Sequence, residues 1–383
     1  MNQSIHQSIR VVLCMLFCFL TSMNVFAQEK HIAASIDSSL YLDPDGNVWT
    51  WGDTKLSSEI NQRIPHLVMQ NGQSVFASPQ EPKSYVIKKD GSLWGWGASN
   101  WGQLGIIRKI GSREGSFVSE PRKVMDQVKD VSGRETIFAL KPDGTLWVWG
   151  SSGPQRGDKS DEDWTTPHKV MDNVEEVSST GYHTVIRKKD GTLWAWGDNQ
   201  CGALGTGDTR ESVKPVRVDV KPLQNRKVVQ IATRWGETYL LADDGTVWYS
   251  GEYNIRQADC LDPPKLVPTK LDTIDNVRAI ALGQFHELYL KKDGSVWASG
   301  YGVAASTPLM TVPAKVGKVM EEVVEIAGGQ SHSIALKKDG TVWVWGENDH
   351  GQLGNGTNRS TTIPVQVHFP AHQPANHAPE MTR

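Results

Sequence analysis

The sequence predicts an all-β protein, a seven-bladed β-propeller of four-stranded antiparallel blades. Three observations predict it: a seven-fold repeat, short alternating apolar segments within each repeat, and tryptophans on alternate residues of one segment. The repeat is an Asp-Gly pair followed by x-(Val/Leu)-Trp, and it begins at Asp45, Asp90, Asp143, Asp190, Asp244, Asp293 and Asp339. Strands with bulky apolar residues on both faces must be covered on both faces, and sheets stacked around an axis provide that cover.

The repeats divide the chain into one propeller with a segment at each end. Successive Asp-Gly pairs are 45 to 54 residues apart. The propeller is expected over residues 28–369, and residues 370–383 read as a disordered His/Pro tail. The seven units are expected near residues 28–72, 73–126, 127–172, 173–223, 224–274, 275–320 and 321–369.

Residues 1–27 have the pattern of a secretory signal peptide. Arg10 is their only charged residue, mostly apolar residues follow from Val11 to Met23, and Val25-Phe26-Ala27 fits a cleavage site before Gln28. The apolar run is shorter than the roughly 20 residues that a membrane span needs. We therefore expect a secreted or periplasmic protein with no membrane span after cleavage.

Each unit is expected to supply four strands in the same order. A short apolar run such as VVEIAGG comes first, and an alternating segment such as HSIAL follows it. The Asp-Gly pair then predicts a type I′ hairpin turn, in which both central residues have positive φ. The third strand is the tryptophan segment, as in TVWVWG. A proline is expected to open the fourth strand, which can accept one as an edge strand; these prolines are Pro65, Pro121, Pro167, Pro215, Pro268, Pro313 and Pro364.

The tryptophans of the third strand are predicted to form the core between blades. A stacking platform or a chromophore is the alternative, but a position repeated in every unit fits a core better. Serine replaces the second tryptophan at Ser250 and Ser299. Twelve of the fifteen tryptophans lie in this strand: Trp49, Trp51, Trp94, Trp96, Trp147, Trp149, Trp194, Trp196, Trp248, Trp297, Trp343 and Trp345.

Units of the form (I/V)AxGxxHSxALKxDGTVWxWGxNxxGQLGxG…PxxV resemble the regulator of chromosome condensation repeat. The fullest copies run from Ile326 to Val367 and from Val177 to Val218. The resemblance implies a seven-bladed propeller, which many family members close by sharing one blade between the chain ends. The chain is also similar to secreted bacterial propellers that bind a partner protein with one face. How this chain closes its ring of blades is left open.

Two motifs of the repeat are carried by only some units. The NxxGxLG element is assigned to units 2, 4 and 7, beginning at Asn100, Asn199 and Asn348. The family histidine occurs at His183, His286 and His332. We interpret these dispersed histidines as local hydrogen-bonding residues rather than metal ligands.

Charge and cysteine content limit the partners. The 40 Lys and Arg residues, which include Arg10, face 43 Asp and Glu, and no basic tail is present, so no nucleic-acid partner is expected. Two cysteines, Cys201 and Cys260, lie outside residues 1–27. An exported protein could pair them, but sequence alone does not place them within bonding distance.

Aromatic residues outside the core are predicted to gather on one face. Antiparallel strands place the Asp-Gly turns on one rim, and they place the first-to-second and third-to-fourth connections on the other. Trp101, Trp164, Tyr253 and Tyr301 are assigned to third-to-fourth connections, and Tyr182, Trp235 and Phe285 to first-to-second connections. Exposed Trp and Tyr are typical of binding hot spots. These seven residues are the candidate partner-binding site.

The expected function is that of an exported protein–protein interaction module that uses this aromatic face. The alternatives are a carbohydrate-binding or carbohydrate-cleaving propeller and a regulator of a small GTPase that resembles the family's founding nucleotide-exchange factor. Phosphate-binding glycine loops, HExxH and GxSxG are absent from the sequence. We therefore expect no cofactor, metal or catalytic residue, and enzyme activity, though left open, is not the favoured interpretation.

Overall fold

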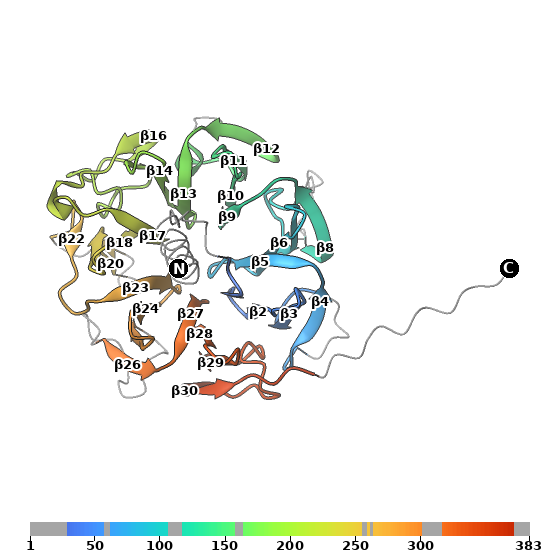
Figure 1. Cartoon of the computed structure of the whole chain (residues 1–383). Helices are drawn as coiled ribbons and strands as arrows, with labels where there is room; N and C mark the ends of the chain where they lie inside the picture. Colours follow the sequence, from blue (N-terminus) through green and yellow to red (C-terminus); the bar gives the residue numbers. More distant parts are fainter. Residues whose placement is uncertain are drawn as a thin grey trace, which may run out of the picture.

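The computed structural model describes residues 29–56, 62–105, 117–157, 164–254, 259–260, 263–300 and 316–370. These residues form seven four-stranded antiparallel sheets around a central axis (Figure 1), which confirms the predicted seven-bladed propeller. The expected leader, Tyr301, Pro313 and the tail from residue 371 lie outside the described residues. Within the described part of the chain, no helix has the length and apolar character needed to cross a bilayer.

The first four blades each use four strands in chain order. Blade 1 consists of β1 (Ile32–Ala34), β2 (Ser38–Leu42), β3 (Val48–Gly52) and β4 (His66–Met69). Blade 2 consists of β5 (Gly72–Ala77), β6 (Lys83–Lys88), β7 (Leu93–Ala98) and β8 (Phe117–Met125). Blade 3 consists of β9 (Asp130–Gly133), β10 (Thr136–Leu140), β11 (Leu146–Gly150) and β12 (Trp164–Met171), with the 3-10 helix η1 (Pro154–Arg156) before β12. Blade 4 consists of β13 (Val174–Ser179), β14 (His183–Lys188), β15 (Leu193–Gly197) and β16 (Ser212–Arg217).

The last three blades follow the same plan, with one additional hairpin. The 3-10 helix η2 (Lys221–Leu223) leads into blade 5, which consists of β17 (Val228–Arg234), β18 (Glu237–Ala242), β19 (Val247–Ser250) and β22 (Thr269–Lys270). The additional hairpin pairs β20 (Tyr253–Asn254) with β21 (Asp259–Cys260). Blade 6 consists of β23 (Val277–Leu282), β24 (His286–Lys291), β25 (Val296–Gly300) and β26 (Gly317–Met320). Blade 7 consists of β27 (Val323–Gly328), β28 (His332–Lys337), β29 (Val342–Gly346) and β30 (Thr361–Gln366).

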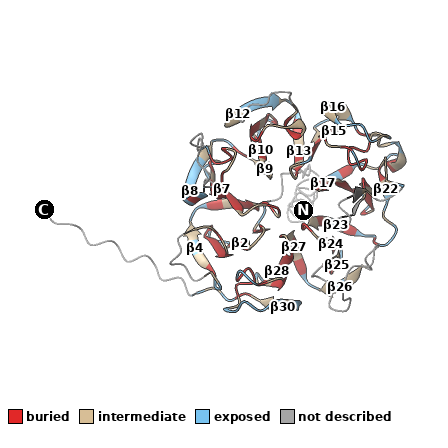
Figure 2. Cartoon of the chain, turned by 180° about the vertical axis from the view of Figure 1, so that it is seen from behind, coloured by how far each residue is buried: buried red, intermediate tan, exposed pale blue. Residues whose placement is uncertain are grey.

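The first strand of every blade lines a central channel of about 2000 Å³, and the fourth strand lies at the perimeter. Burial decreases from the channel to the perimeter. The perimeter strands β8 and β12 contain many exposed residues, as Figure 2 shows. Blade 1 and blade 7 each contain only their own four strands. Among the described residues no strand is shared between these two blades. Side-chain hydrogen bonds join β1–β3 to blade 7 instead.

The Asp-Gly hairpins use a different turn from the one expected. Gly191 has a φ of +82°, but Asp190 is not among the positive-φ residues, so the turn is not type I′. The amide of Gly191 donates to the carbonyl of Lys188, and the amide of Lys188 donates to the carbonyl of Thr192. This is a type I turn followed by a left-handed glycine that forms a bulge. The Asp190 carboxylate accepts hydrogen bonds from the amide of Thr192 at 2.9 Å and from its hydroxyl at 2.7 Å, which stabilise the turn.

The two tryptophan positions of the third strand have different environments. The second tryptophans are at most 1% exposed, as the core prediction requires: Trp51, Trp96, Trp149, Trp196 and Trp345. Five of the first tryptophans are only partly buried, so this position is less buried than the core prediction requires. They are Trp94, Trp147, Trp194, Trp297 and Trp343. These lie beside the Asp-Gly turns, where lysines cover them.

Most prolines do not open the fourth strand. Pro65 precedes β4 and Pro268 precedes β22, as expected, but Pro121 lies inside β8. The same correction applies to three further blades, in Pro167, Pro215 and Pro364. Each of these strands is the outer edge of its blade, where a missing N–H leaves no ladder bond unmade. Edge position, rather than strand start, explains the prolines.

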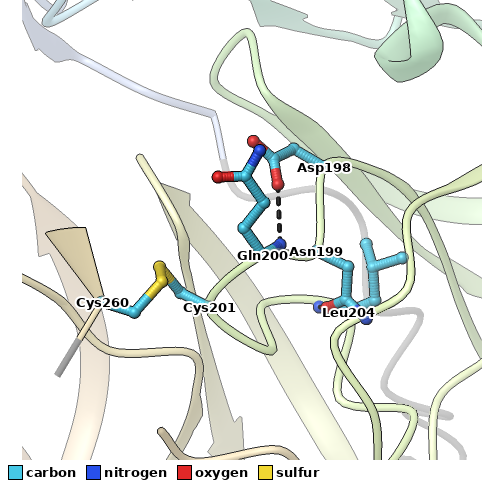
Figure 3. Close-up of a disulfide and its surroundings, with 6 residues drawn as sticks. All are labelled: Asp198, Asn199, Gln200, Cys201, Leu204 and Cys260. Carbon is cyan, nitrogen blue, oxygen red and sulfur yellow. Dashed lines mark hydrogen bonds between the residues drawn. A yellow bond between two sulfur atoms is a disulfide. The ribbon is translucent and has the colours of Figure 1, made fainter. Parts of the chain in front are cut away.

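The pairing of the two cysteines, left open by the sequence, is settled by the structure. Cys201 and Cys260 form a disulfide with Cα atoms 5.2 Å apart (Figure 3). The bond joins the β15–β16 connection of blade 4 to the β20–β21 hairpin that follows blade 5 strand β19. Two neighbouring blades are therefore linked covalently at their loops.

Candidate functional site

The propeller has two faces with different roles. We call the hairpin turns at residues 43–47, 88–92, 141–145, 188–192, 242–246, 291–295 and 337–341 the Asp-Gly rim. We call the opposite side, formed by the first-to-second and third-to-fourth connections, the loop face. A face whose side chains already contact other parts of the protein is less available to a ligand, so we compare these contacts on the two faces.

Hydrogen bonds and cation–π contacts within the protein occupy the Asp-Gly rim. The indole N–H of Trp194 donates to Thr192 Oγ1 at 3.0 Å, and the Thr192 hydroxyl donates to Asp190. These bonds hold the pKa of Asp190 below its ordinary value. The Lys188 Nζ lies 5.1 Å above the centre of the Trp194 ring. The same cation–tryptophan contact recurs at Lys88–Trp94, Lys141–Trp147, Arg226–Trp248, Lys291–Trp297 and Lys337–Trp343.

A second set of rim lysines joins neighbouring blades. Lys189 Nζ donates to the carbonyl of Asp143 at 2.9 Å, from blade 4 to the turn of blade 3. Lys292 Nζ makes the equivalent bond to the carbonyl of Asp244 at 3.1 Å. The lysine-rich character of the rim thus has a structural explanation.

The three family histidines connect blades in the interior. His183 Nε2 lies 2.8 Å from Thr238 Oγ1 of the next blade, and the histidine is fully buried. His286 lies 3.0 Å from Ser333 Oγ, and His332 lies 2.9 Å from Ser39 Oγ. The interpretation of these histidines as hydrogen-bonding residues is confirmed. Burial lowers their pKa values, to about 4 for His183 and His332 and to about 3 for His286.

Asparagine side chains shape the loops after the third strand in blades 4 and 7. Asn199 Oδ1 accepts from the amide of Leu204, and Asn348 Oδ1 accepts from Leu353, both at 2.9 Å. In blade 2 the equivalent bond comes to Ser99 Oγ, from Leu104 at 3.0 Å. The assignment of this role to Asn100 is therefore wrong by one residue. Counting from the glycine that ends the third-strand motif, Trp101, Cys201 and His350 occupy equivalent loop positions.

Two of the predicted binding residues are in contact across a blade boundary. Tyr182, in the β13–β14 connection, stacks on Trp235, in the β17–β18 connection, with ring centres 5.6 Å apart and planes 22° apart. Tyr182 is 37% exposed and Trp235 is partly buried. Thr233 Oγ1 in β17 lies 2.9 Å from Ser178 Oγ in β13, so a hydroxyl contact also joins these two blades. The pair offers an ordered aromatic surface on the loop face.

The other predicted binding residues have separate environments. Phe285 lies in the β23–β24 connection and Trp101 in the β7–β8 connection, and both are partly buried. Tyr253 lies in β20, between β19 and β22 as expected, but its side chain and all of Tyr301 are outside the described part.

Trp164 is not a loop residue. It is the first residue of β12, with the Arg156 guanidinium 4.3 Å from its ring centre on one side and the His168 ring at 4.1 Å. The expected loop placement was wrong because η1 and β12 extend over this part of the third-to-fourth connection. Its contacts give Trp164 a structural role in blade 3.

The sequence analysis missed a cluster of possible metal ligands on the loop face. Ligand atoms of Asp37, Asp53 and His350 all lie within 4.8 Å of one another. The first two residues come from blade 1 and the third from blade 7, so no linear motif connects them. Only the repeat register combined with ring closure could have placed them together.

Comparison with known families identifies the repeat. The family model described as the regulator of chromosome condensation (RCC1) repeat matches residues 90–133, 190–236 and 339–378. A second model of the same repeat matches residues 174–203 and 323–352. These matches fall in units 2 to 5 and in unit 7.

Several known proteins are similar to this chain over a part of their length. The human (Homo sapiens) E3 ubiquitin-protein ligase HERC2 is 30% identical over 312 residues, which are 75% of this chain and 6% of the ligase. The Arabidopsis thaliana ultraviolet-B receptor UVR8 is 28% identical over 66% of this chain and 60% of the receptor. A secretion-regulating guanine nucleotide exchange factor from Mus musculus is 29% identical over 62% of this chain and 54% of that protein. The matched part is thus less than two thirds of each relative.

Solved structures share the fold. Human WBSCR16 superimposes with a TM-score of 0.68 at 23% identity, over 81% of this chain and 85% of that one. Yeast RCC1 (Prp20), in its structure bound to Kap60, gives a TM-score of 0.71 at 20% identity, over 90% and 89% of the two chains. The matched repeats identify this chain as a regulator of chromosome condensation (RCC1) repeat protein, and the solved structures share its fold.

Proposed function

We propose that this chain is an exported protein-interaction module that captures a partner protein with its loop face. The stacked pair of Tyr182 and Trp235 is the observation that carries the proposal. Large aromatic side chains with few rotatable bonds bury much area on binding at a small entropic cost, and ordering them in advance lowers that cost further. Phe285, in the corresponding connection of the next blade, extends the surface.

The opposite rim supports this choice of face. Its lysines and tryptophans already contact each other, and Lys189 and Lys292 donate to carbonyls of the preceding blades. A partner at the rim would have to displace these contacts. At the loop face it meets Tyr182 without breaking such a set.

Export is supported by the leader-like residues 1–27 and by the disulfide. Disulfides form and persist in oxidising compartments, such as the periplasm or the extracellular space. The Cys201–Cys260 bond fits a protein that matures there.

Affinity capture with matched variants tests the proposal. The purified protein is immobilised and exposed to the extracellular or periplasmic fraction of its host, and retained proteins are identified by mass spectrometry. A Tyr182→Ser, Trp235→Ser, Phe285→Ser variant should lose the partner while its Tm stays close to that of the parent. Phe117→Ser is the matched control, because Phe117 is a 51% exposed aromatic on the perimeter strand β8.

The outcomes separate the candidate functions. A partner retained equally by parent and triple variant would place binding elsewhere. If the triple variant unfolds, Tyr182→Ser alone repeats the test, because this side chain is the most exposed of the three. Retention of glycans instead of a protein would favour the carbohydrate-binding alternative.

A second candidate is a regulator of a small GTPase, favoured by the 29% identity to the mouse exchange factor. The protein would then accelerate the release of a labelled guanine nucleotide from a GTPase. The proposed export argues against this function. Absence of such acceleration, together with capture of an exported partner, would dismiss it.

A further inference from the structure

The boundary between blade 7 and blade 1 carries a cluster of polar side chains on the loop face. Asp37 lies in the β1–β2 connection, Asp53 follows β3, and His350 lies in the β29–β30 connection. One ligand atom from each lies within 4.8 Å of the other two. The cluster therefore bridges the two ends of the propeller at the place where no strand is shared.

The donor set is mixed, which distinguishes it from an ordinary group of surface acids. One imidazole nitrogen and two carboxylate oxygens are the ligands that first-row divalent cations accept in proteins. Zn²⁺ bonds of about 2.1 Å in tetrahedral geometry place ligand atoms about 3.4 Å apart. His350 is exposed, so rotation of its side chain can bring a ring nitrogen closer to the two carboxylates.

The two carboxylates of the cluster have different surroundings. Asp37 is partly buried, and Asp53 forms an ion pair with Lys55. Two carboxylates this close to each other and to an imidazole attract a divalent cation.

We propose that Asp37, Asp53 and His350 bind a divalent transition-metal ion, with Zn²⁺ as the best fit, and that the ion fastens blade 7 to blade 1. Three protein ligands leave a fourth position open on the loop face for water or for a ligand group of a bound partner. The metal ion would hold the two ends of the ring together at the blade boundary that other propellers close with a shared strand. It is independent of the aromatic surface on blades 4 to 6.

Lys55 supplies the sharpest test, because it competes with the metal. Its ammonium forms an ion pair with Asp53, so a metal ion has to displace it. Removing the lysine should therefore tighten metal binding, whereas removing a ligand should weaken it. A surface that merely attracts cations without coordinating them would show no such dependence on individual ligands.

The experiment measures Zn²⁺ binding by calorimetry, and Tm with Zn²⁺ and with EDTA, on the tag-free protein. The parent should bind one ion at this site and should melt at a higher temperature with Zn²⁺ than with EDTA. Asp37→Asn and His350→Ala should each weaken the site at least about tenfold and remove the Tm difference. Lys55→Ala should bind more tightly than the parent.

Controls separate this site from others. Asp349→Asn changes an exposed neighbour outside the cluster and should bind as the parent does. The tail histidines remain in every variant, so weak binding there survives His350→Ala and is recognised by its unchanged affinity. The proposal is wrong if the parent binds no Zn²⁺, or if Asp37→Asn and His350→Ala bind as tightly as Asp349→Asn. An Asp37→Asn protein that fails to fold leaves His350→Ala, an exposed position, to decide.

Discussion

His332 of blade 7 lies 2.9 Å from the hydroxyl of Ser39 in blade 1, a residue 293 positions earlier in the chain. The same Ser39 hydroxyl lies 2.9 Å from the carbonyl of Gln352, which also accepts the indole N–H of Trp51 at 2.8 Å. Blades 3 and 4 share this arrangement, since Trp196 and Thr184 both donate to the carbonyl of Gln155. Ring closure thus repeats the contact that joins internal blades.

The first prediction concerns acid. The folded pKa values of His183, His286 and His332 lie at about 3 to 4, below the value of about 6.5 in an unfolded chain. Between these limits the unfolded state binds more protons, so the free energy of unfolding falls as pH decreases. Each histidine contributes a slope of about 1.4 kcal/mol per pH unit in this window. Urea unfolding at pH 4.5 to 7.5 measures it.

A variant checks the origin of this slope. His286→Gln keeps a hydrogen-bonding group beside Ser333. It should reduce the slope of unfolding free energy against pH by about one third, because one of the three histidines that take up a proton on unfolding is gone. His31 acts in the opposite direction, because its hydrogen bond to Glu325 raises its pKa and its contribution is present below pH 6.5 and lost above it. An unchanged slope in His286→Gln would show that other groups cause the acid sensitivity.

The second prediction concerns the segment after β30. Phe369 packs on three aromatic rings of blade 1. The centre of its ring lies 4.9 Å from that of Tyr41, 5.6 Å from that of Trp49 and 5.9 Å from that of Trp51. Phe369→Ala should lower the free energy of unfolding by about 2 kcal/mol, less than a fully buried phenylalanine would. Ile363→Ala, at a 67% exposed position of β30, should stay within about 0.5 kcal/mol of the parent. Equal effects in urea titrations would argue against a closing role for Phe369.

The sequence could predict features that depend on local periodicity. Trp345 and its equivalents were assigned to the core because alternation along one strand decides which face a side chain occupies. The contact between Tyr182 and Trp235 depends on how two blades are rotated against each other, which no single repeat encodes. The Asp37, Asp53 and His350 cluster needs, in addition, the closure of the whole ring. The sequence analysis placed Trp164 in a loop because the repeat does not show that β12 begins as early as Trp164.

The third prediction concerns the disulfide. Cys201 and Cys260 are 59 residues apart, so their bond removes much conformational freedom from the unfolded chain. Reduction should lower the free energy of unfolding by about 2–4 kcal/mol. Thermal melts with and without dithiothreitol measure the loss, and a Cys201→Ser, Cys260→Ser double variant should melt near the reduced parent in both. If the oxidised and reduced proteins melt together, the bond contributes little to stability.

The fourth prediction concerns a buried ion network where blades 5 and 6 lack the second tryptophan. Arg234 is 7% exposed and its guanidinium contacts Glu237 at 2.7 Å and Glu287 at 2.5 Å, while Glu287 also accepts a hydrogen bond from Ser299. Arg234→Met removes the cation that Glu237 and Glu287 share and should cost about 3–5 kcal/mol in urea unfolding. Neutralising both partners in an Arg234→Met, Glu237→Gln, Glu287→Gln variant should recover most of that loss, because the buried negative charges are then removed as well.

Lys123→Met, which breaks an exposed pair with Asp126, is the control and should change the free energy of unfolding by less than about 1 kcal/mol. A triple variant no more stable than Arg234→Met would mean that packing of the arginine, rather than its charge, holds these blades together.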